Sequence, residues 1–292
     1  MGTSWQVRVA TDGACDAKAL GAAIQTKLDF LTQEMSHWDP NSLLGRFNRS
    51  PAGSWHALPP DFTAVIDLAL TVATRSVGAF DPTLGALVDL WGHGPSGPQP
   101  QPSAHAIAHL LPWSGWQRLT WDRAARRLRQ PGHASLDLSG IAKGHAVDAV
   151  ATLLAERGFA HMLVEIGGEL AGRGMRPDGE PWWVDLEAVT PALPAFRIAL
   201  HDMAVATSGT YVRGGHTIDP ASGRPCNNDV IAVSILHPSA ALADAWASAL
   251  FVLGSERALA VAEDQGLAMR MVTQMLTGYR ETISPALAAM LA

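Results

Sequence analysis

Apolar side chains recur at helical spacing along several parts of the chain. Between Ala17 and Trp38 an apolar residue stands at about every third or fourth position, and the pattern ends at the polar turn that begins with Asp39. This spacing predicts a helix with one buried side. The same pattern predicts further helices after Asp61, from near Ser139 to Arg157, over Ser239–Leu253 and over Ser255–Gln265.

Shorter stretches rich in β-branched and aromatic residues predict strands instead. Leu267, Met269 and Met271 alternate with their neighbours, as expected for a strand. The predicted strands are residues 1–10, His161–Ile166, Trp182–Leu186, Phe196–Leu200, Val230–Leu236 and Leu267–Thr273. Strands and helices follow one another in a mixed, irregular order. This order favours an α+β architecture over a regular doubly wound sheet.

Chain length and one biased segment bear on the domain organisation. The 292 residues suffice for one large or two ordinary domains, and we expect a single compact unit. Gly92–Ala104 differs from the rest of the chain because it is rich in glycine and proline. We predict that residues 92–104 form a mobile surface loop without a catalytic role.

Composition and charge exclude several classes of protein. Hydrophobic residues make up 48% of the chain, and 21 Lys and Arg against 27 Asp and Glu give a net charge of −6. An acidic balance argues against a nucleic-acid surface. No apolar run is long enough to cross a bilayer. Cys15 and Cys226 show no paired metal spacing.

The tract from Thr207 to Ser248 brings together groups that can do chemistry. Its parts are a predicted Thr207-Ser-Gly209 turn, a predicted turn with His216 and Asp219, and a predicted helix with Asp244 and Ser248. Because Asp244 and Ser248 are four positions apart, their oxygen atoms share one helix face and suit a hard cation. Two other interpretations stay open. Asp244 can instead pair with an arginine, and His216 can be structural.

Residues 136–144 form a second candidate site, at the start of a predicted helix. Asp137, Ser139 and Lys143 lie within it, and the free N–H groups of a helix N-terminus attract anions. The alternative is a helix that is simply capped by Ser139. The glycine-rich residues 167–174 lack the spacing of a dinucleotide motif, and we interpret them as a structural turn.

Eight motifs, taken together and in order, resemble one protein family. They are Met1–Val7, Met35–Ser42 with Arg46–Asn48, Gly78–Thr83 with Leu90–Gly92, Leu136–Gly144, Ile166–Glu169, Ala206–Gly209, His216–Gly223 and Ala243–Ala249. In this order they are similar to the ApbE-type FAD:protein FMN transferases. The resemblance covers essentially the whole chain, so a single domain of this family is expected over residues 1–292.

The resemblance implies both a fold and a reaction. The fold would be a T-fold-like unit of mixed, largely antiparallel sheets with helices packed on them. The enzyme would bind FAD, break its pyrophosphate, attach FMN through a phosphoester to a threonine of an acceptor protein, and release AMP. Mg²⁺ would be its metal cofactor, FAD its substrate and the acceptor protein its partner.

The resemblance also assigns roles to individual residues. Contacts to FAD are expected from Met1, Trp38, Ala79, Phe80, Asp81, Asp137, Lys143 and Ile218. Trp38 would lie against the isoalloxazine, and Thr207 and Ser208 would line the adenosine or phosphate side. Magnesium would be held by Asp244, Ser248 and the main-chain oxygen of Gly140. His216 is the candidate base for the acceptor threonine, and Asp219 would orient either His216 or a metal-bound water.

Some features depart from the family pattern. Ser248 stands where threonine is usual, which keeps the hydroxyl but loses a methyl group that restricts the rotamer. Family members are often exported lipoproteins, whereas this sequence begins inside the first motif. We therefore expect a cytoplasmic protein, or a periplasmic one if a signal segment was removed. Two alternatives to transfer are a metal-dependent FAD pyrophosphatase, giving FMN and AMP, and a flavin-binding protein without turnover.

Overall fold

The computed structural model describes residues 2–186, 188–191, 193–210 and 215–291. Met1, which the resemblance assigns to FAD, lies outside the described residues. Contacts divide the chain into two compact units. Unit 1 consists of Met1–Asp29, Lys143–Val212 and Asn228–Ala292, and unit 2 of Phe30–Ala142 and Arg213–Asn227. The first helix, α1 (Ala17–Met35), begins in unit 1 and ends in unit 2.

A seven-stranded sheet forms the centre of unit 1. Its strands, in spatial order, are β1 (Trp5–Ala10), β5 (His161–Ile166), β6 (Glu169–Arg173), β9 (Met203–Gly209), β12 (Val230–His237), β13 (Ala268–Gln274) and β14 (Tyr279–Ile283). Every neighbouring pair in this sheet is antiparallel. Together with the helices described below, this confirms the predicted α+β class with largely antiparallel sheets.

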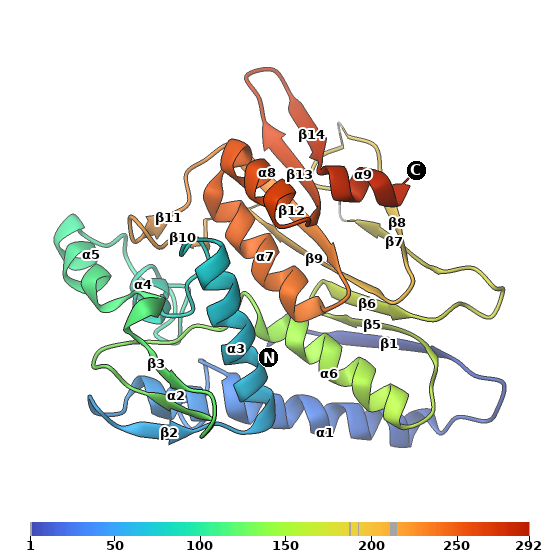
Figure 1. Cartoon of the computed structure of the whole chain (residues 1–292), viewed down its shortest axis with the longest axis horizontal. Coiled ribbons are helices and arrows are strands. Elements are labelled where there is room, and N and C mark those ends of the chain that lie inside the picture. The colour runs from blue at the N-terminus through green and yellow to red at the C-terminus, as the bar shows by residue number, and fades with distance from the viewer. Residues whose placement is uncertain (1, 187, 192, 211–214, 292) are drawn as a thin grey trace. The chain divides into compact units, whose positions relative to one another are not determined.

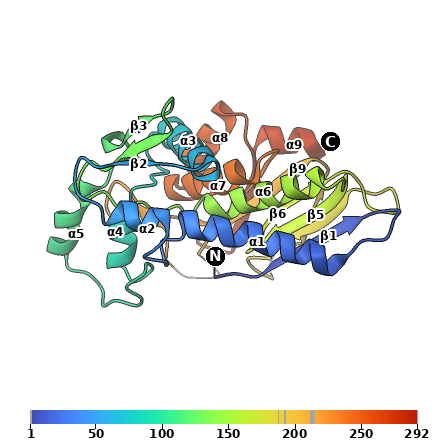
Figure 2. The same ribbon diagram turned by 90° about the horizontal axis from the view of Figure 1, so that it is seen from below.

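Helices cover one face of this sheet. The helix α7 (Ala240–Leu253) crosses β9 and β12, and α8 (Ser255–Asp264) contacts both α7 and β13 (Figure 1). The helix α6 (Ala142–Glu156) lies beside β5 and β6 in two views (Figure 1, Figure 2). Most side chains of α7 are buried, and its many alanines allow close approach to the sheet.

An apolar cluster covers the other face of the sheet. It is supplied by the antiparallel pair β7 (Trp182–Leu186) and β8 (Phe196–Leu200) and by α9 (Pro285–Leu291). Buried side chains of these elements, such as Trp182 and Leu287, pack with Leu163 and Val205 from the sheet. Unit 1 therefore has a layer on each face of the sheet.

Two segments of unit 1 differ from the sequence interpretation. Thr207–Gly209 is the end of strand β9, and not a turn. In residues 167–174, only the two glycines make the turn, because Glu169–Arg173 forms strand β6. The glycines of residues 167–174 led to the prediction of a turn. Gly172 instead lies within β6, where the close approach of a neighbouring chain segment requires a residue without a side chain. A Cβ atom at this position would lie 2.7 Å from the main-chain oxygen of Leu200.

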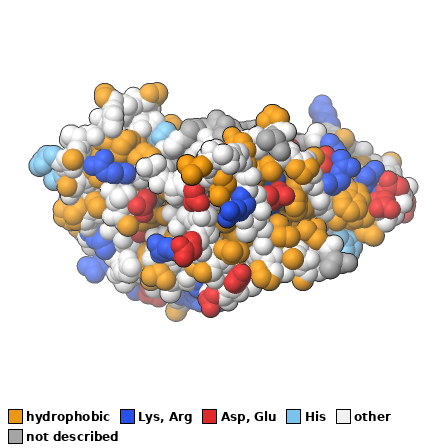
Figure 3. Space-filling model, turned by 90° about the horizontal axis from the view of Figure 1, so that it is seen from above, with side chains coloured by type: hydrophobic (Ala, Val, Ile, Leu, Met, Phe, Trp, Pro, Cys, Tyr) orange, Lys and Arg blue, Asp and Glu red, His pale blue; other side chains and the backbone are white. Residues whose placement is uncertain are grey.

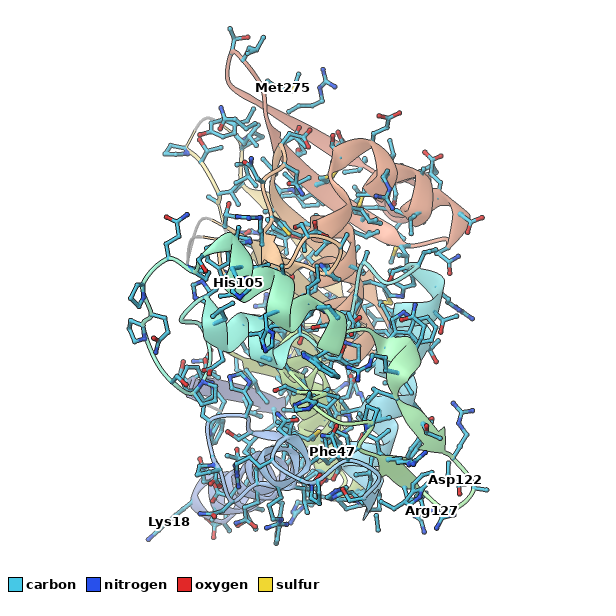
Figure 4. All side chains as sticks on the ribbon, turned by 90° about the vertical axis from the view of Figure 1, so that its left-hand side faces the viewer. Lys18, Phe47, His105, Asp122, Arg127 and Met275 are labelled. Carbon is cyan, nitrogen blue, oxygen red and sulfur yellow. The ribbon has the colours of Figure 1, made fainter. Side chains whose placement is uncertain are left out.

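Unit 2 is built from short elements around one longer helix. Its helices are α2 (Leu43–Asn48), α3 (Pro60–Arg75), α4 (Gly85–Leu90) and α5 (Ala104–Leu110), followed by two short 3₁₀ turns at Leu111–Trp113 and Trp116–Arg118. A small antiparallel sheet has the order β2 (Trp55–Ala57), β4 (Arg127–Arg129) and β3 (Thr120–Asp122). Where β3 turns into β4, Asp122 and Arg127 form an ion pair of 3.1 Å (Figure 4).

The second chain segment of unit 2 is anchored by an apolar side chain. It contains the pair β10 (Ile218–Asp219) and β11 (Arg224–Pro225). The Ile218 side chain is 3% exposed and belongs to an apolar cluster with Leu84, Leu87 and Ile107. The indole N–H of Trp91 also donates a hydrogen bond of 2.9 Å to the main-chain oxygen of Gly223. These contacts hold residues 218–223 against the region around α4.

The loop predicted over residues 92–104 contains no helix or strand before α5 begins at Ala104. It is nevertheless tied to α4, because the N–H and hydroxyl groups of Ser96 both donate to the Asp89 carboxylate, each over 2.7 Å. The mobility of this loop stays a prediction.

The distribution of charged side chains on the surface agrees with the weakly acidic composition. On the face drawn in Figure 3, Lys and Arg side chains are interspersed with Asp and Glu, and they form no continuous basic area. Among the described residues, no helix has the length and apolar character needed to span a membrane.

Candidate active site

A buried cluster of charges lies in unit 1 where α6, β6 and α7 meet. The ammonium group of Lys143, in the first turn of α6, is in direct contact with Oε1 of Glu169 at the start of β6. Oδ1 of Asp244 on α7 lies 3.8 Å from the same ammonium. Glu169 and Asp244 are each only 3% exposed. The cluster thus holds two carboxylates and one ammonium in a largely desolvated place.

Burial shifts the titration of both carboxyl groups in this cluster. It raises the pKa of Glu169 to about 7, with the nearby Asp244 charge adding to the effect and Lys143 opposing it. Burial also raises the pKa of Asp244, against the favourable effects of Lys143 and the Gly144 N–H. Strongly shifted carboxyl groups next to a cation are typical of functional sites.

The Asp244 carboxylate is held by the backbone as well as by Lys143. The N–H of Gly144 donates to Oδ2 of Asp244 over 3.1 Å. Gly144 allows α6 and α7 to approach this closely, because a Cβ atom there would lie 2.2 Å from the main-chain oxygen of Ala240. At the start of α7, the carboxylate of Asp148 accepts hydrogen bonds from the N–H groups of Ala240 and Ala241 over 2.9 and 3.0 Å. Asp148 therefore satisfies free donors at the start of α7.

Hydroxyl groups line the same helix one turn further on. Asp244 and Ser248 both lie on α7, as their spacing predicts. The Ser248 hydroxyl is 3.1 Å from that of Ser208 on β9. Thr207, next to Ser208, instead pairs with Ser234 on β12 across 2.8 Å. The structure therefore brings Lys143, Ser208, Asp244 and Ser248 into one region of unit 1.

The chemistry of these groups fits a hard cation with few protein ligands. Within the described part of the chain, no group of three or more His, Cys, Asp and Glu residues is arranged to hold a metal. Asp244 nevertheless supplies a buried carboxylate and Ser248 a hydroxyl one turn away, and oxygen donors of this kind suit Mg²⁺. Gly140, the predicted third ligand, belongs to unit 2, and its role stays a prediction.

Unit 2 contains a largely buried pair of interacting groups, His37 and Asp137. Nδ1 of His37 lies 3.2 Å from Oδ1 of Asp137. Burial disfavours the charge on each, but the attraction between them is stronger, so the pKa of His37 is raised and that of Asp137 is lowered. The N–H of Ser139 also donates to Asp137 over 2.9 Å. Asp137 is therefore fixed by its neighbours.

Trp38 lies next to this pair and is unusually open for an aromatic residue. Its side chain is 57% exposed, and its ring centroid is 5.0 Å from that of His37. An exposed indole on a fixed histidine offers a flat apolar surface for a planar ring. The structure thus leaves Trp38 available for the stacking role that the resemblance implies.

The residues from Ala79 to Asp81 are mostly interior. Ala79 and Phe80 are 9% and 6% exposed. Burial raises the pKa of Asp81, although hydrogen bonds from Thr83 and from the N–H of Trp116 oppose the shift. Oδ2 of Asp81 accepts from Trp116 over 3.0 Å and Oδ1 from the Thr83 hydroxyl over 2.6 Å. Asp81 therefore organises the turn around it.

His216 and Asp219 lie in the second segment of unit 2. The His216 ring packs edge-on against the His93 ring, with 6.4 Å between centroids. Asp219 accepts from the N–H of Ala221 over 2.9 Å and from the Ser222 hydroxyl over 2.7 Å. These hydrogen bonds stabilise the turn that contains Asp219. Its predicted role in orienting His216 or a water stays a prediction.

Glu169 is a buried charged residue that sequence reasoning did not single out. It was seen only as the last residue of the Ile166–Glu169 motif. The available signal was an acidic side chain directly after a Gly-Gly turn and ahead of Leu170-Ala171. That signal indicates an acid at a strand start, but only the fold places Lys143 beside it.

A comparison with known protein families shows to which family the chain belongs. The model of the ApbE family matches residues 1–271. The chain belongs to the ApbE family. A single domain of this family over residues 1–292 stays a prediction.

Relatives within the ApbE family are similar over nearly the whole chain. The FAD:protein FMN transferase of Klebsiella pneumoniae is 34% identical over 98% of this chain and 85% of its own length. The flavin transferase ApbE of Vibrio cholerae superposes with a TM-score of 0.92 and 33% identity, covering 99% of this chain and 96% of its own. For the apo flavinyl transferase ApbE of Pseudomonas stutzeri, the TM-score is 0.90 at 36% identity, over 98% and 92% of the two chains.

Proposed function

We propose that this protein transfers the FMN part of FAD to a threonine hydroxyl of an acceptor protein, in a magnesium-dependent reaction that releases AMP. One observation carries the proposal: 98% of the chain aligns, at 34% identity, with a relative named FAD:protein FMN transferase. The clustering of Lys143, Asp244 and Ser248 in unit 1 supports it, because phosphoryl transfer needs positive charge and oxygen ligands.

The proposed reaction exchanges one phosphorus–oxygen bond for another. The threonine oxygen attacks the phosphorus of the FMN part, and the bond from that phosphorus to the bridging oxygen of the pyrophosphate breaks. AMP leaves with the bridging oxygen. His216 is proposed to accept the proton of the threonine hydroxyl, since a histidine imidazole can act as a general base near neutral pH.

The remaining residues are proposed to bind and orient FAD. In unit 2, the exposed Trp38 would stack on the isoalloxazine, and Phe80, Asp81 and Asp137 would shape the surroundings. Ala79 and Ile218 are buried, so they would act by fixing the backbone near the ligand.

In unit 1, Lys143 would lie near the pyrophosphate charge, and Thr207 and Ser208 on the adenosine or phosphate side. A magnesium ion held by Asp244 and Ser248 would neutralise charge on the pyrophosphate.

The test is an assay with purified protein, FAD, Mg²⁺ and an acceptor domain that carries a target threonine. We expect flavin fluorescence that stays with the acceptor after denaturation, a mass increase equal to FMN less one water, and AMP in equal amount. An acceptor whose threonine is replaced by valine serves as the control and should stay unmodified. Free FMN and AMP without acceptor labelling would identify a pyrophosphatase instead, and unchanged FAD would identify a binding protein.

A further inference from the structure

Lys143 is shared unequally between two buried carboxylates. Its ammonium is in direct contact with Glu169, whereas Oδ1 of Asp244 is 3.8 Å away. The Lys143 side chain is 28% exposed, but the Glu169 and Asp244 side chains are only 3% and 4% exposed. The ammonium is therefore drawn to the Glu169 side of the cluster.

The bonding of Glu169 indicates that its contact with Lys143 is its main interaction. Its second oxygen, Oε2, is buried and has no hydrogen-bond partner in the described structure. A buried carboxylate with a purely structural role usually has both oxygens satisfied. Asp244, in contrast, keeps one oxygen on the Gly144 N–H and leaves the other only loosely approached by Lys143.

This arrangement matters because an ammonium and a divalent cation compete for the same carboxylate. Attraction between opposite charges is strong where water is largely excluded. Without Glu169, Asp244 would be the remaining carboxylate beside Lys143, and the ammonium would move toward it. A close Lys143–Asp244 ion pair would occupy the oxygen that a divalent cation needs.

We propose that Glu169 is a positioning residue that holds the Lys143 ammonium away from Asp244 and so leaves the Asp244 carboxylate available to a divalent cation. The inference rests on the proposed function, from which it takes Asp244 as a cation ligand. Glu169 itself does not bind the cation in this arrangement. It acts through Lys143.

Binding of Mn²⁺ to the full chain without FAD tests this inference directly. Binding is followed by electron paramagnetic resonance, so no catalytic activity enters the readout. Glu169→Gln is expected to weaken Mn²⁺ binding by about 10- to 100-fold, the usual effect of losing a group that orients a metal ligand. Adding Lys143→Met to Glu169→Gln removes the competing ammonium and should restore the affinity to within about threefold of the unmodified protein.

A structural readout and a matched control accompany the binding data. In a crystal structure of the Glu169→Gln variant, the distance from Lys143 Nζ to Asp244 Oδ1 should fall below 3.8 Å. Glu281→Gln is the control, because it removes the carboxylate of another partly buried ion pair of unit 1, with Arg270 at 2.6 Å. It should leave Mn²⁺ binding unchanged.

Several results would overturn the inference. Unchanged Mn²⁺ affinity in Glu169→Gln would do so, as would a weakened affinity that Lys143→Met does not restore, because Glu169 would then act without Lys143. If Glu169→Gln does not fold, Lys143→Met alone decides: it should bind Mn²⁺ at least as tightly as the unmodified protein, and weaker binding contradicts the inference. Mn²⁺ binding that is unaffected by Asp244→Asn would instead refute the metal assignment of the proposed function.

Discussion

The main-chain N–H of Gly144 donates a hydrogen bond of 3.1 Å to the Asp244 carboxylate, so the first turn of α6 fixes a side chain that projects from α7. The two residues are 100 positions apart in the chain. The position of this carboxylate therefore depends on how closely the two helices approach. Any change that separates them should alter both stability and the behaviour of Asp244.

Gly144→Ala tests the importance of this close approach. The added Cβ would meet the backbone at Ala240, so α6 and α7 must separate. We expect a loss of about 1–3 kcal/mol in the free energy of unfolding, as for other overpacked sites, together with weaker Mn²⁺ binding. Gly21→Ala on α1 is the matched control, because nothing lies within 4 Å of a Cβ there. It should be neutral or stabilising, and equal losses in both variants would contradict the explanation.

Ser248 is predicted to act through its hydroxyl group. Ser248→Ala should weaken the response of the transfer rate to Mg²⁺ by about tenfold or more, since even outer groups of metal sites have effects of this size. Ser248→Thr keeps the oxygen and restricts the rotamer, so it should bind the cation as tightly or more tightly. Both are measured by titrating Mg²⁺ against the transfer rate.

Ser234→Ala provides the control for the Ser248 variants. It removes a buried hydroxyl from the neighbouring pair with Thr207, and the Mg²⁺ response should not change. A normal Mg²⁺ response in Ser248→Ala would show that the cation binds elsewhere.

His216→Ala should separate binding from chemistry. We expect FAD to bind with unchanged affinity, because the imidazole is assigned to proton transfer and not to FAD. The rate of transfer to the acceptor should fall by about 10²- to 10⁴-fold, the usual contribution of a general base. Flavin fluorescence measures binding, and covalent labelling of the acceptor measures the rate.

His105→Ala, on α5 of the same unit (Figure 4), serves as the control for His216 and should leave both quantities unchanged. Full transfer activity in His216→Ala would remove this residue from the reaction.

The His37–Asp137 pair should make the stability of the protein depend on pH. The pKa of His37 is raised from 6.5, so its contribution is complete below 6.5 and is lost as the pH rises through the raised value. The pKa of Asp137 is lowered from 3.8, so its contribution is complete above 3.8 and is lost as the pH falls through the lowered value. The pair therefore stabilises the folded protein most between these two reference values.

His37→Asn keeps a hydrogen-bond donor but removes the charge, which makes the pH dependence measurable. The free energy of unfolding is measured by urea titration at about pH 5.5 and about pH 9, on either side of the ordinary histidine pKa. The loss caused by the substitution should be larger at the lower pH. Equal losses at the two pH values would mean that the charge on His37 does not contribute.

Regular patterns allowed much of the fold to be predicted from the sequence. The predicted bounds of β5, β7 and β8 coincide with those observed, and α7 begins one residue later than expected. In these segments the apolar pattern is strong and local. The strands β6 and β9 were missed, since Gly172 and the Thr207–Gly209 sequence are more typical of turns. Their conformation is set by neighbouring strands, which a local pattern does not reveal.

The candidate site was predictable where its residues are close in sequence. The shared face of Asp244 and Ser248 follows from helical geometry alone. The place of Glu169 in the site was not predictable in this way. It depends on the burial of Glu169 beside Lys143, which is 26 positions away in the chain. The same is true of the contact between His37 and Asp137. Such pairs exist only after the chain has folded.

The division of unit 1 into three chain segments has a consequence for how the protein is made. During synthesis β1 emerges early, but its partner β5 follows only after the first segment of unit 2 has been completed. Strands β12 and β13 appear later still, after the second segment. Pairing between distant segments is slow, and unpaired strands are prone to aggregate. The nascent chain therefore carries β1 unpaired until β5 has been translated, and during that interval the exposed strand is open to aggregation.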